Sequence, residues 1–413
     1  MIELKKFGEV CDFVRGPFGG SLKKSCFVEE GYAVYEQQHA IYNQFSDIRY
    51  FVTEDKFNEM KRFELKPNDL IMSCSGTMGK VAIVPEGIQK GIINQALLKL
   101  TPKDFLDIEY LKYWMSSPDF DNRIEENTVG AAIKNVASVK ILKQIDVPVP
   151  PLEEQKKIVA ILDDAFEAID QVQANIAKNI ENAKELFQSK LNEIFSQKGE
   201  GWEEKSLGEV STVLNGFAFK SKDTVTHSDT QLLRMGNLYK NVLDLTRNPV
   251  FYPDKFATDY NKYVLNAGDL IMSLTGTVDK TDYGYTVEVP ETNIHLLLNQ
   301  RIMKIDVIDE DALDKKFLRH YLQSKTFLET LYATASGTRQ ANLSSKTILT
   351  LVINFPKDLA KQEELVYLIE ALKDFTLNLE IDYQQKLTNL EDLKKSLLEK
   401  AFAGELTHKD MTV

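Results

Sequence analysis

Apolar residues recur at steps of three and four along two long stretches of this chain, and this spacing predicts two long amphipathic helices. The first helix is expected to begin after Val147–Pro151, because prolines cannot continue a helix backward, and to end at Lys198–Gly201. Its apolar positions are Ile158, Leu162, Ala165, Ile169, Val172, Ile176, Ala183, Phe187, Leu191 and Ile194. The second is expected to begin after Pro356 and to end at Gly404. Its positions are Leu365, Leu368, Leu372, Phe375, Leu379, Tyr383, Leu387, Leu390, Leu393 and Leu397.

Helices of about 45 residues are about 65–70 Å long, which is longer than one globular core can cover. Each must bury its apolar stripe on something else, and repeats sustained this long are typical of a coiled-coil seam. The sequence predicts that the two helices pair with each other, antiparallel and within one chain. Dimerisation between chains through either helix is the alternative.

Elsewhere the apolar runs are short and are separated by Gly, Pro and Asn, which is typical of strands joined by turns. Two short helices are expected after the strands in each half of the chain, at 108–115 and 118–126 and again at 313–323 and 326–333. The expected strands include Ala33–Tyr35, Leu70–Met72, Val81–Val84, Ala96–Leu98, Leu232–Leu233 and Leu270–Met272.

The chain contains an internal duplication. Asp69–Ser73 returns as Asp269–Ser273 at an offset of 200, and Gly130 and Asn135 match Gly337 and Asn342 at an offset of 207. A repeat this long is a duplicated domain rather than a solenoid unit of about 20–50 residues. We therefore expect an α+β fold of two similar mixed α/β domains separated by the two helices. The predicted boundaries are 1–150, 151–198, 199–356 and 357–413.

The formal net charge of −12 is concentrated in the predicted helices. Residues 153–194 carry nine acids and five lysines, and residues 358–405 carry eleven acids and six lysines. Acid-rich helices are poor surfaces for DNA phosphates. The remainder of the chain is close to neutral, so its globular domains can bind phosphates if their Lys and Arg residues cluster.

No motif for catalysis, for a metal or for a cofactor is evident in the sequence. Gly76–Lys80 has the wrong spacing for a phosphate-binding loop, and the five histidines never pair at metal-ligand spacing. Glu64–Lys66 resembles part of a nuclease motif, but its counterpart Val264–Asn266 lacks both charges. We expect a chain that is not an enzyme on its own, with free thiols at Cys11, Cys26 and Cys74 in a reducing cytoplasm.

Polar loops in both domains are candidate DNA contacts. Gln and Asn can read adenine in the major groove, and Lys or Arg beside a Gly-Thr turn suits a phosphate. An ordinary polar loop or hairpin is the alternative at each place. The candidates are Gln37, Gln38, Thr77, Lys80, Lys134 and Asn135 in the first domain and Arg234, Asn237, Thr277, Lys280, Arg339 and Gln340 in the second.

The layout resembles that of the specificity subunits of type I restriction–modification enzymes. The segment Val147–Val159 resembles the family's proline-then-Glu-Gln start of a helix, and Phe355–Leu365 is a weaker copy without the double proline. Gly268–Ser273 also resembles family sequence, with Asn68 in place of the glycine in the first copy. The resemblance covers essentially the whole chain.

The resemblance implies that each domain reads one half of a bipartite double-stranded DNA target and that the helices space the halves. It also implies docking of two methyltransferase subunits, which use S-adenosylmethionine on adenine, and of ATP-dependent endonuclease subunits. The helix starts are the implied partner contacts, at Glu154, Gln155, Ile158, Gln362 and Leu365. The competing interpretation is a non-enzymatic coiled-coil adaptor with two protein-binding heads, and salt-dependent bipartite DNA binding distinguishes the two.

Overall fold

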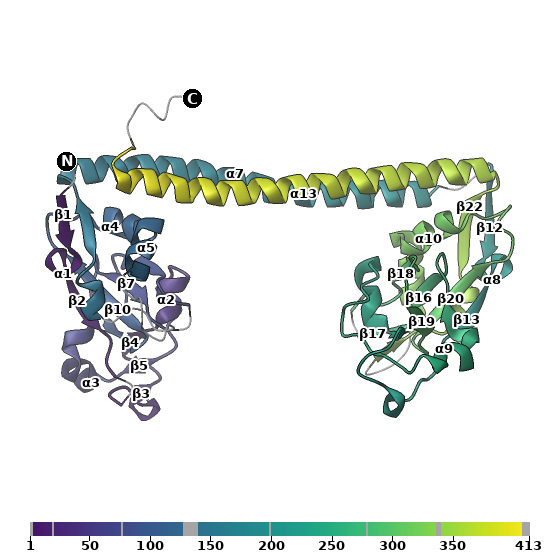
Figure 1. The fold of residues 1–413 in the computed structure, drawn as a ribbon, viewed down its shortest axis with the longest axis horizontal. Coiled ribbons are helices and arrows are strands. Elements are labelled where there is room, and N and C mark those ends of the chain that lie inside the picture. Colours follow the sequence, from purple (N-terminus) through teal and green to yellow (C-terminus); the bar gives the residue numbers. More distant parts are fainter. Residues whose placement is uncertain are drawn as a thin grey trace. The chain divides into compact units, whose positions relative to one another are not determined.

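The structure is a computed structural model. It describes residues 3–18, 20–75, 77–126, 139–197, 200–277, 280–335 and 340–406. It divides into two compact units (Figure 1). Unit 1 comprises Met1–Ala177 and Tyr383–Val413, and unit 2 comprises Lys178–Asp382. Each unit therefore contains one globular domain and half of each long helix. The sequence predicted four segments, with each long helix as a segment of its own. The two units divide the chain differently, so those four boundaries stay a prediction.

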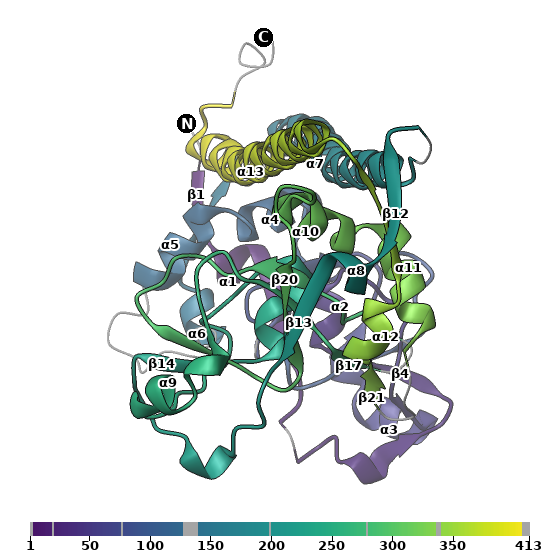
Figure 2. The same cartoon turned by 90° about the vertical axis from the view of Figure 1, so that its right-hand side faces the viewer.

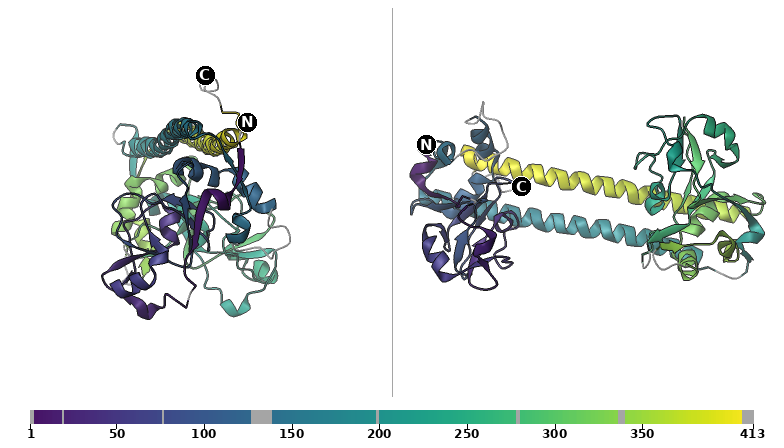
Figure 3. Two further views of the ribbon diagram at one scale, coloured as in Figure 1. Left: turned by 90° about the vertical axis from the view of Figure 1, so that its left-hand side faces the viewer. Right: turned by 90° about the horizontal axis from the view of Figure 1, so that it is seen from below.

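The globular domain of unit 1 consists of sheets with short helices. β1 (Glu3–Lys6) pairs antiparallel with β11 (Asp146–Val149), which joins the two ends of the domain beside the long helices (Figure 3). An antiparallel sheet has the order β2 (Cys11–Arg15), β10 (Leu97–Pro102), β7 (Leu70–Ser73), β8 (Val81–Ile83). A mixed sheet has the order β3 (Phe27–Val28), β5 (Phe51–Val52), β4 (Tyr32–Tyr35), β9 (Gly91–Ile93), β6 (Glu64–Leu65), and within it β4 and β9 are parallel. The helices are α1 (Phe7–Val10), α2 (Gln37–Ile41), α3 (Glu54–Glu59), α4 (Ile108–Met115), α5 (Pro118–Glu126) and α6 (Val139–Leu142).

Unit 2 repeats this plan. β12 (Trp202–Ser206) pairs with β22 (Val352–Pro356), and the antiparallel sheet is β13 (Ser211–Asn215), β20 (Ile302–Val307), β16 (Leu270–Ser273), β18 (Thr286–Glu288). The mixed sheet is β14 (Thr230–Leu233), β19 (His295–Leu298), β15 (Val264–Leu265), with β14 and β19 parallel. β17 (Thr275–Thr277) pairs with β21 (Gln340–Asn342). The helices are α8 (Leu207–Val210), α9 (Lys255–Asp259), α10 (Lys315–Gln323), α11 (Lys325–Ala333) and α12 (Ser345–Leu349).

The short helices match the sequence prediction closely. α4 and α5 have the predicted bounds, whereas α10 begins two residues later than expected. The reason is that the Asp314 carboxylate caps α10 by accepting from the Phe317 N–H at 2.7 Å. The cysteines Cys11, Cys26 and Cys74 are free thiols, as predicted.

The aspartate of the repeated Asp-Leu-Ile-Met-Ser motif forms the same largely buried ion pair in both units. Asp69 lies 3.5 Å from the Lys99 ammonium, and Asp269 lies 3.0 Å from that of Lys304. Both carboxylates also accept from a backbone N–H three residues earlier, so the turn before the strand is fixed. A buried charge needs such partners, which explains why this motif recurs as a unit.

The long helices are α7 (Leu152–Phe195) and α13 (Leu359–Ala403), and they pair antiparallel in each unit (Figure 1). In unit 1, Asp170 contacts Lys394 and Gln173 contacts Glu391. In unit 2, Lys184 lies 3.8 Å from Glu380. Rising numbers on α7 meet falling numbers on α13, so the predicted intramolecular antiparallel coiled coil is confirmed. α13 ends before Gly404, whose φ of 77° stops the helix, as predicted.

Not every predicted seam position is buried. Val172, Leu368, Phe375 and Leu393 are 44–62% exposed. A straight helix drifts by about 20° per heptad relative to a 3.5-residue repeat, so one stripe cannot face one partner along the whole length. These exposed apolar side chains are available to other molecules.

A buried glutamine fastens each long helix to its own globular domain. Gln155 accepts from Asp107 N–H at 2.8 Å and donates to the carbonyls of Phe105 and Pro150. Gln362 likewise accepts from Asp314 N–H at 2.8 Å and donates to the carbonyls of Ala312 and Pro356. Both side chains are fully buried. The sequence-based assignment of Gln155 and Gln362 to partner contacts is therefore corrected: they tie the helix start to the cap of the neighbouring domain helix.

The other predicted partner contacts divide by burial. Ile158 and Leu365 lie in the hydrophobic cores of units 1 and 2, so their assignment is corrected in the same way. Glu154 is exposed, so its assignment stays a prediction.

A second fastening joins the middle of the domain helices to the long helices. In unit 1 the Tyr113 hydroxyl donates to Asp163. The corresponding place in unit 2 has the buried His320, whose Nε2 lies 3.5 Å from Glu370, and Arg319, which bridges Glu370 at 2.6 Å and Glu288 at 2.7 Å. Both residues lie on α10, which lies beside the long helices (Figure 2). Burial, followed by the nearby Arg319 charge, lowers the pKa of His320 from 6.5 to about 4.

We predict that His320 makes unit 2 less stable in mild acid. Because its pKa is lower in the folded chain than in the unfolded chain, its contribution is fully present above about pH 6.5 and is lost as the pH falls toward 4. The loss is at most about 3 kcal/mol. Urea unfolding from pH 7 to 4.5 should show a smaller fall for His320→Gln, which cannot titrate, than for the parent chain. Equal slopes would contradict the assignment.

Candidate nucleic-acid interface

In both units, the carboxyl ends of two parallel strands meet at one edge of the mixed sheet. Tyr35 pairs with Ile93 in unit 1, and Leu233 pairs with Leu298 in unit 2. The next residues are Glu36 and Asn94 in the first case and Arg234 and Asn299 in the second. Ligands commonly bind outside the carboxyl ends of parallel strands, because the chain reverses there and leaves a crevice. This edge is the candidate site in each unit.

A glycine lets the neighbouring backbone approach this edge closely. A Cβ at Gly16 would overlap the carbonyl oxygen of Asn94, and one at Gly216 would overlap that of Asn299. The asparagine side chains then fix the loop beyond. Asn94 accepts from Ala96 N–H at 2.9 Å, and Asn299 accepts from Arg301 N–H at 3.1 Å. The glycine, the two parallel strand ends and the asparagine thus form the same fixed backbone arrangement in both units, which we call the edge frame.

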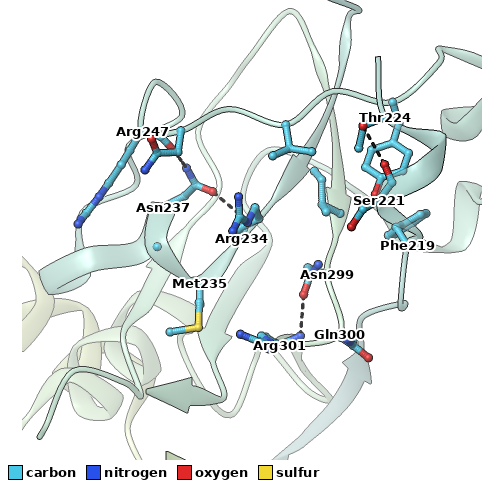
Figure 4. Close-up of a pocket in the computed structure, with 15 residues that line it drawn as sticks. Phe219, Ser221, Thr224, Arg234, Met235, Asn237, Arg247, Asn299, Gln300 and Arg301 are labelled. Carbon is cyan, nitrogen blue, oxygen red and sulfur yellow. Dashed lines mark hydrogen bonds between the residues drawn. The ribbon is translucent and has the colours of Figure 1, made fainter. Parts of the chain in front are cut away.

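In unit 2 the edge borders a hollow of about 540 Å³ (Figure 4). Its charged lining residues are all arginines: Arg234 and Arg301, which lie in the middle of the view, and Arg247 at one side. All three are exposed and form no ion pair with any residue that the structure describes. The Arg247 guanidinium lies over the Tyr239 ring, 5.0 Å from its centroid. The remaining lining residues are Phe219, Ser221, Thr224, Leu232, Met235, Gly236, Asn237, Asn248, Val250, Tyr252, Asn299 and Gln300.

In unit 1 the corresponding hollow is smaller, about 160 Å³, and its chemistry differs. Glu36 stands where unit 2 has Arg234, and it is held by Arg49 at 3.1 Å. Lys24 and Gln95 also line the hollow. The edge frame thus carries a glutamate in the first domain, whereas in the second domain it carries arginines that form no ion pair with the described residues.

A buried side chain holds the residue that follows the first strand in each unit. Asn237 accepts from Arg234 N–H at 2.8 Å and donates to the carbonyls of Asp244 and Arg247 at 2.8 and 3.0 Å. His39 takes this role in unit 1, with Nδ1 2.9 Å from the Glu36 nitrogen and Nε2 3.1 Å from the Asp47 carbonyl oxygen. Every polar group of the Asn237 side chain is thus engaged. Its predicted role as a DNA contact is corrected to a positioning role for Arg234.

The other predicted DNA contacts in the first domain are placed as follows. Gln37 lies at the start of α2, and its Oε1 is buried without a hydrogen-bond partner among the described residues. Gln38 donates to the Asp47 carbonyl at 3.2 Å, so it supports the same loop as His39. Thr77 and Lys80 are exposed, and the Ser73 hydroxyl closes their turn by donating to the Thr77 carbonyl and accepting from Lys80 N–H.

In the second domain Thr277 and Lys280 are also exposed. Thr277 is fixed by Asp282, which accepts from both its N–H and its hydroxyl at 2.7 Å. Gln340 lies opposite Thr277 in the β17–β21 pair. Lys134, Asn135 and Arg339 lie outside the described residues. The structure thus brings Arg234 to the edge site. Thr77, Lys80, Thr277 and Lys280 are exposed but line neither hollow, and Thr277 lies at the end of strand β17.

The second half of each edge site was not predicted from the sequence. Asn94-Gln95 and Asn299-Gln300 form a repeated dipeptide after the second parallel strand, and Arg301 follows the latter. That repeat, at an offset of 205, was the available signal. The repeated dipeptide could not be assigned to the site, because the pairing of two parallel strands far apart in the sequence cannot be read from the linear pattern.

Comparison with known proteins identifies the family. The family described as "Type I restriction modification DNA specificity domain" matches residues 2–182 and 199–389. The chain belongs to this family. Its function is therefore DNA sequence specificity, and the two matched segments are the two copies found by internal duplication. The competing adaptor interpretation receives no support.

Individual relatives agree over most of their length. The chain is 26% identical to the MjaVIII specificity subunit of Methanocaldococcus jannaschii, over 85% of this chain and 82% of the relative. It is 23% identical to the EcoKI specificity subunit of Escherichia coli, over 86% and 78%. The HsdS subunit from Thermoanaerobacter tengcongensis has a similar fold, with a TM-score of 0.61 and 18% identity over 98% and 97% of the two chains. As a member of the specificity-domain family, the chain has a non-catalytic role.

The described residues contain no cluster of His, Cys, Asp or Glu that could hold a metal ion. None of the helices in that part of the chain has a run long and apolar enough for a membrane span. Both findings concern the described residues alone.

We predict that Asn237→Ala destabilises unit 2 by about 1–3 kcal/mol, because it leaves one N–H and two carbonyl groups without their partner. Urea unfolding followed by circular dichroism measures this. The control is Asn293→Ala, an exposed asparagine in the same unit, which should change the free energy of unfolding by less than about 0.5 kcal/mol. Equal effects of the two substitutions would show that Asn237 does not hold the loop.

Proposed function

We propose that this chain is the specificity subunit of a type I restriction–modification complex that acts on a bipartite, asymmetric DNA target in the cytoplasm. The main support is that the edge frame occurs in both domains with different side chains. The first domain has Glu36 there, and the second has Arg234 and Arg301. Two similar domains with different contact residues read two different half-sites. The two long helices set the spacing between the halves.

Two methyltransferase subunits are the proposed partners, and endonuclease subunits complete a nuclease form of the complex. The methyltransferase supplies the S-adenosylmethionine chemistry. Phosphate contacts made by these partners offset the net charge of −12 on this chain.

The test is methylation by the chain with and without a partner methyltransferase. Alone, the chain should transfer no methyl group from labelled S-adenosylmethionine to DNA. With the partner, sequencing of methylated sites should show two specified segments separated by unspecified base pairs. Replacing residues 1–145 with the first domain of another family member should change one segment only, and a change in both would contradict independent reading by the two domains.

An apolar groove in the helical half of unit 2 is the proposed docking surface for a methyltransferase subunit. It has a volume of about 400 Å³ and is lined by Leu186, Phe187, Lys190, Leu191, Glu193, Ile194, Leu368, Ile369 and Leu372. Leu186 and Leu368 are 52% and 49% exposed, and Tyr367 and Phe375 on the same stretch of α13 are 73% and 62% exposed. Exposed apolar patches of this kind mark protein interfaces. This surface replaces the buried glutamines as the proposed partner contact.

We predict that Leu186→Asp combined with Leu368→Asp weakens methyltransferase binding about tenfold or more, because a carboxylate must be desolvated in the interface. Calorimetric titration of the folded chain with the partner measures it. Gln188→Asp is the control, since this exposed residue lies on the opposite side of α7 from Leu186. Unchanged affinity of the double variant would exclude the groove.

A further inference from the structure

We infer that Arg234 and Arg301 read guanine, so that the half-site recognised by the second domain contains at least one G·C pair whose guanine is contacted in the major groove. This inference rests on the proposed function and assigns the base chemistry that the function leaves open.

The first argument is the choice of cation. The chain has nine arginines among 50 basic residues, yet three arginines and no lysine line this one hollow. A lysine binds a phosphate as a point charge, whereas the planar fork of an arginine can meet two acceptors at once, on a phosphate or on a base. Arginine is favoured where two parallel N–H groups must meet two acceptors in one plane. Guanine presents such a pair in the major groove, at O6 and N7.

The second argument is that both side chains are uncommitted. Arg49, Arg123 and Arg319 are each paired with a carboxylate at 2.6–3.1 Å. Arg234 and Arg301 form no ion pair among the described residues, and no Asp or Glu lines their hollow. A ligand therefore does not have to displace an internal carboxylate before it is bound.

The third argument is pre-organisation of the backbone. The N–H of Arg234 is held by the buried Asn237, and the N–H of Arg301 is held by Asn299. Parallel pairing of β14 with β19 places both residues just beyond one sheet edge (Figure 4). A side chain that reads a base edge must be attached to a backbone whose position is fixed, whereas a phosphate can be bound from a mobile segment.

The matching edge of the first domain supplies the contrast. There Glu36 replaces Arg234 and Ala96 replaces Arg301 on the same frame. Retaining the frame while exchanging these two side chains is the pattern expected if they choose the base. The guanine assignment accordingly applies to the second domain alone.

The experiment uses the full chain with its partner methyltransferase and compares Arg234→Lys, Arg301→Lys and the double variant with the parent. Arg62→Lys, an exposed position in the first domain, is the charge-matched control. Sites methylated in a random-sequence library are sequenced. The expected result is relaxed preference at guanine positions in the second half-site only, by about 5- to 150-fold for each arginine, with the first half-site and the control unchanged.

A second measurement removes the acceptor instead of the donor. Once the target is known, binding is measured to duplexes in which 7-deazaguanine replaces each guanine of the second half-site in turn. At least one replacement should weaken binding of the parent complex and have little further effect on the corresponding lysine variant.

Three outcomes would overturn the inference. They are a second half-site without any G·C pair, unchanged base preference in both lysine variants, and a uniform loss across all sequences, which is the signature of phosphate contacts. A bipartite target would remain in each of these cases, so the proposed function would stand. Absence of any sequence-specific methylation by the parent complex would instead refute the proposed function.

Discussion

The attachment of each long helix to its own globular domain through a buried glutamine is the constraint on which the rest of the structure depends. Gln155 and Gln362 each make three hydrogen bonds to backbone groups, two just before a domain helix and one at the end of the strand that leads into the long helix. A buried amide with all its groups paired is stable, whereas one that loses a partner costs about 1–3 kcal/mol. The helix direction is thereby fixed relative to the domain within each unit. A specificity subunit needs this rigidity, because a domain that swivels on its helix cannot hold one register on DNA.

The second fastening shows how a duplicated fold can keep a geometry while changing its chemistry. Tyr113 with Asp163 in unit 1 becomes Arg319 and His320 with Glu370 in unit 2. The hydroxyl–carboxylate hydrogen bond of unit 1 corresponds in unit 2 to a network of a carboxylate, a guanidinium and a histidine with a lowered pKa. The two units therefore share this attachment but differ in its charge.

The recognition edges follow the same logic. Gly16 and Gly216 permit the same close backbone approach, and Asn94 and Asn299 fix the same loop. The frame is determined by backbone packing, which tolerates little change. The side chains that face solvent at its rim can vary without loss of the fold. Family membership thus establishes DNA specificity, and we propose that the exposed rim residues decide which sequence is read.

The sequence by itself determined the duplication, the two long helices, the short helices of each domain and the absence of catalytic motifs. These follow from local periodicity, from capping residues and from matched segments, all of which are linear signals. The tertiary structure alone decided which polar residues are available. Gln155 and Gln362 look like contact residues in the sequence, but they are buried because backbone groups 48–50 residues away need their amides. Arg301 joins Arg234 only through the parallel pairing of strands more than 60 residues apart. Burial and strand pairing depend on contacts far apart in the chain, so no local pattern could reveal them.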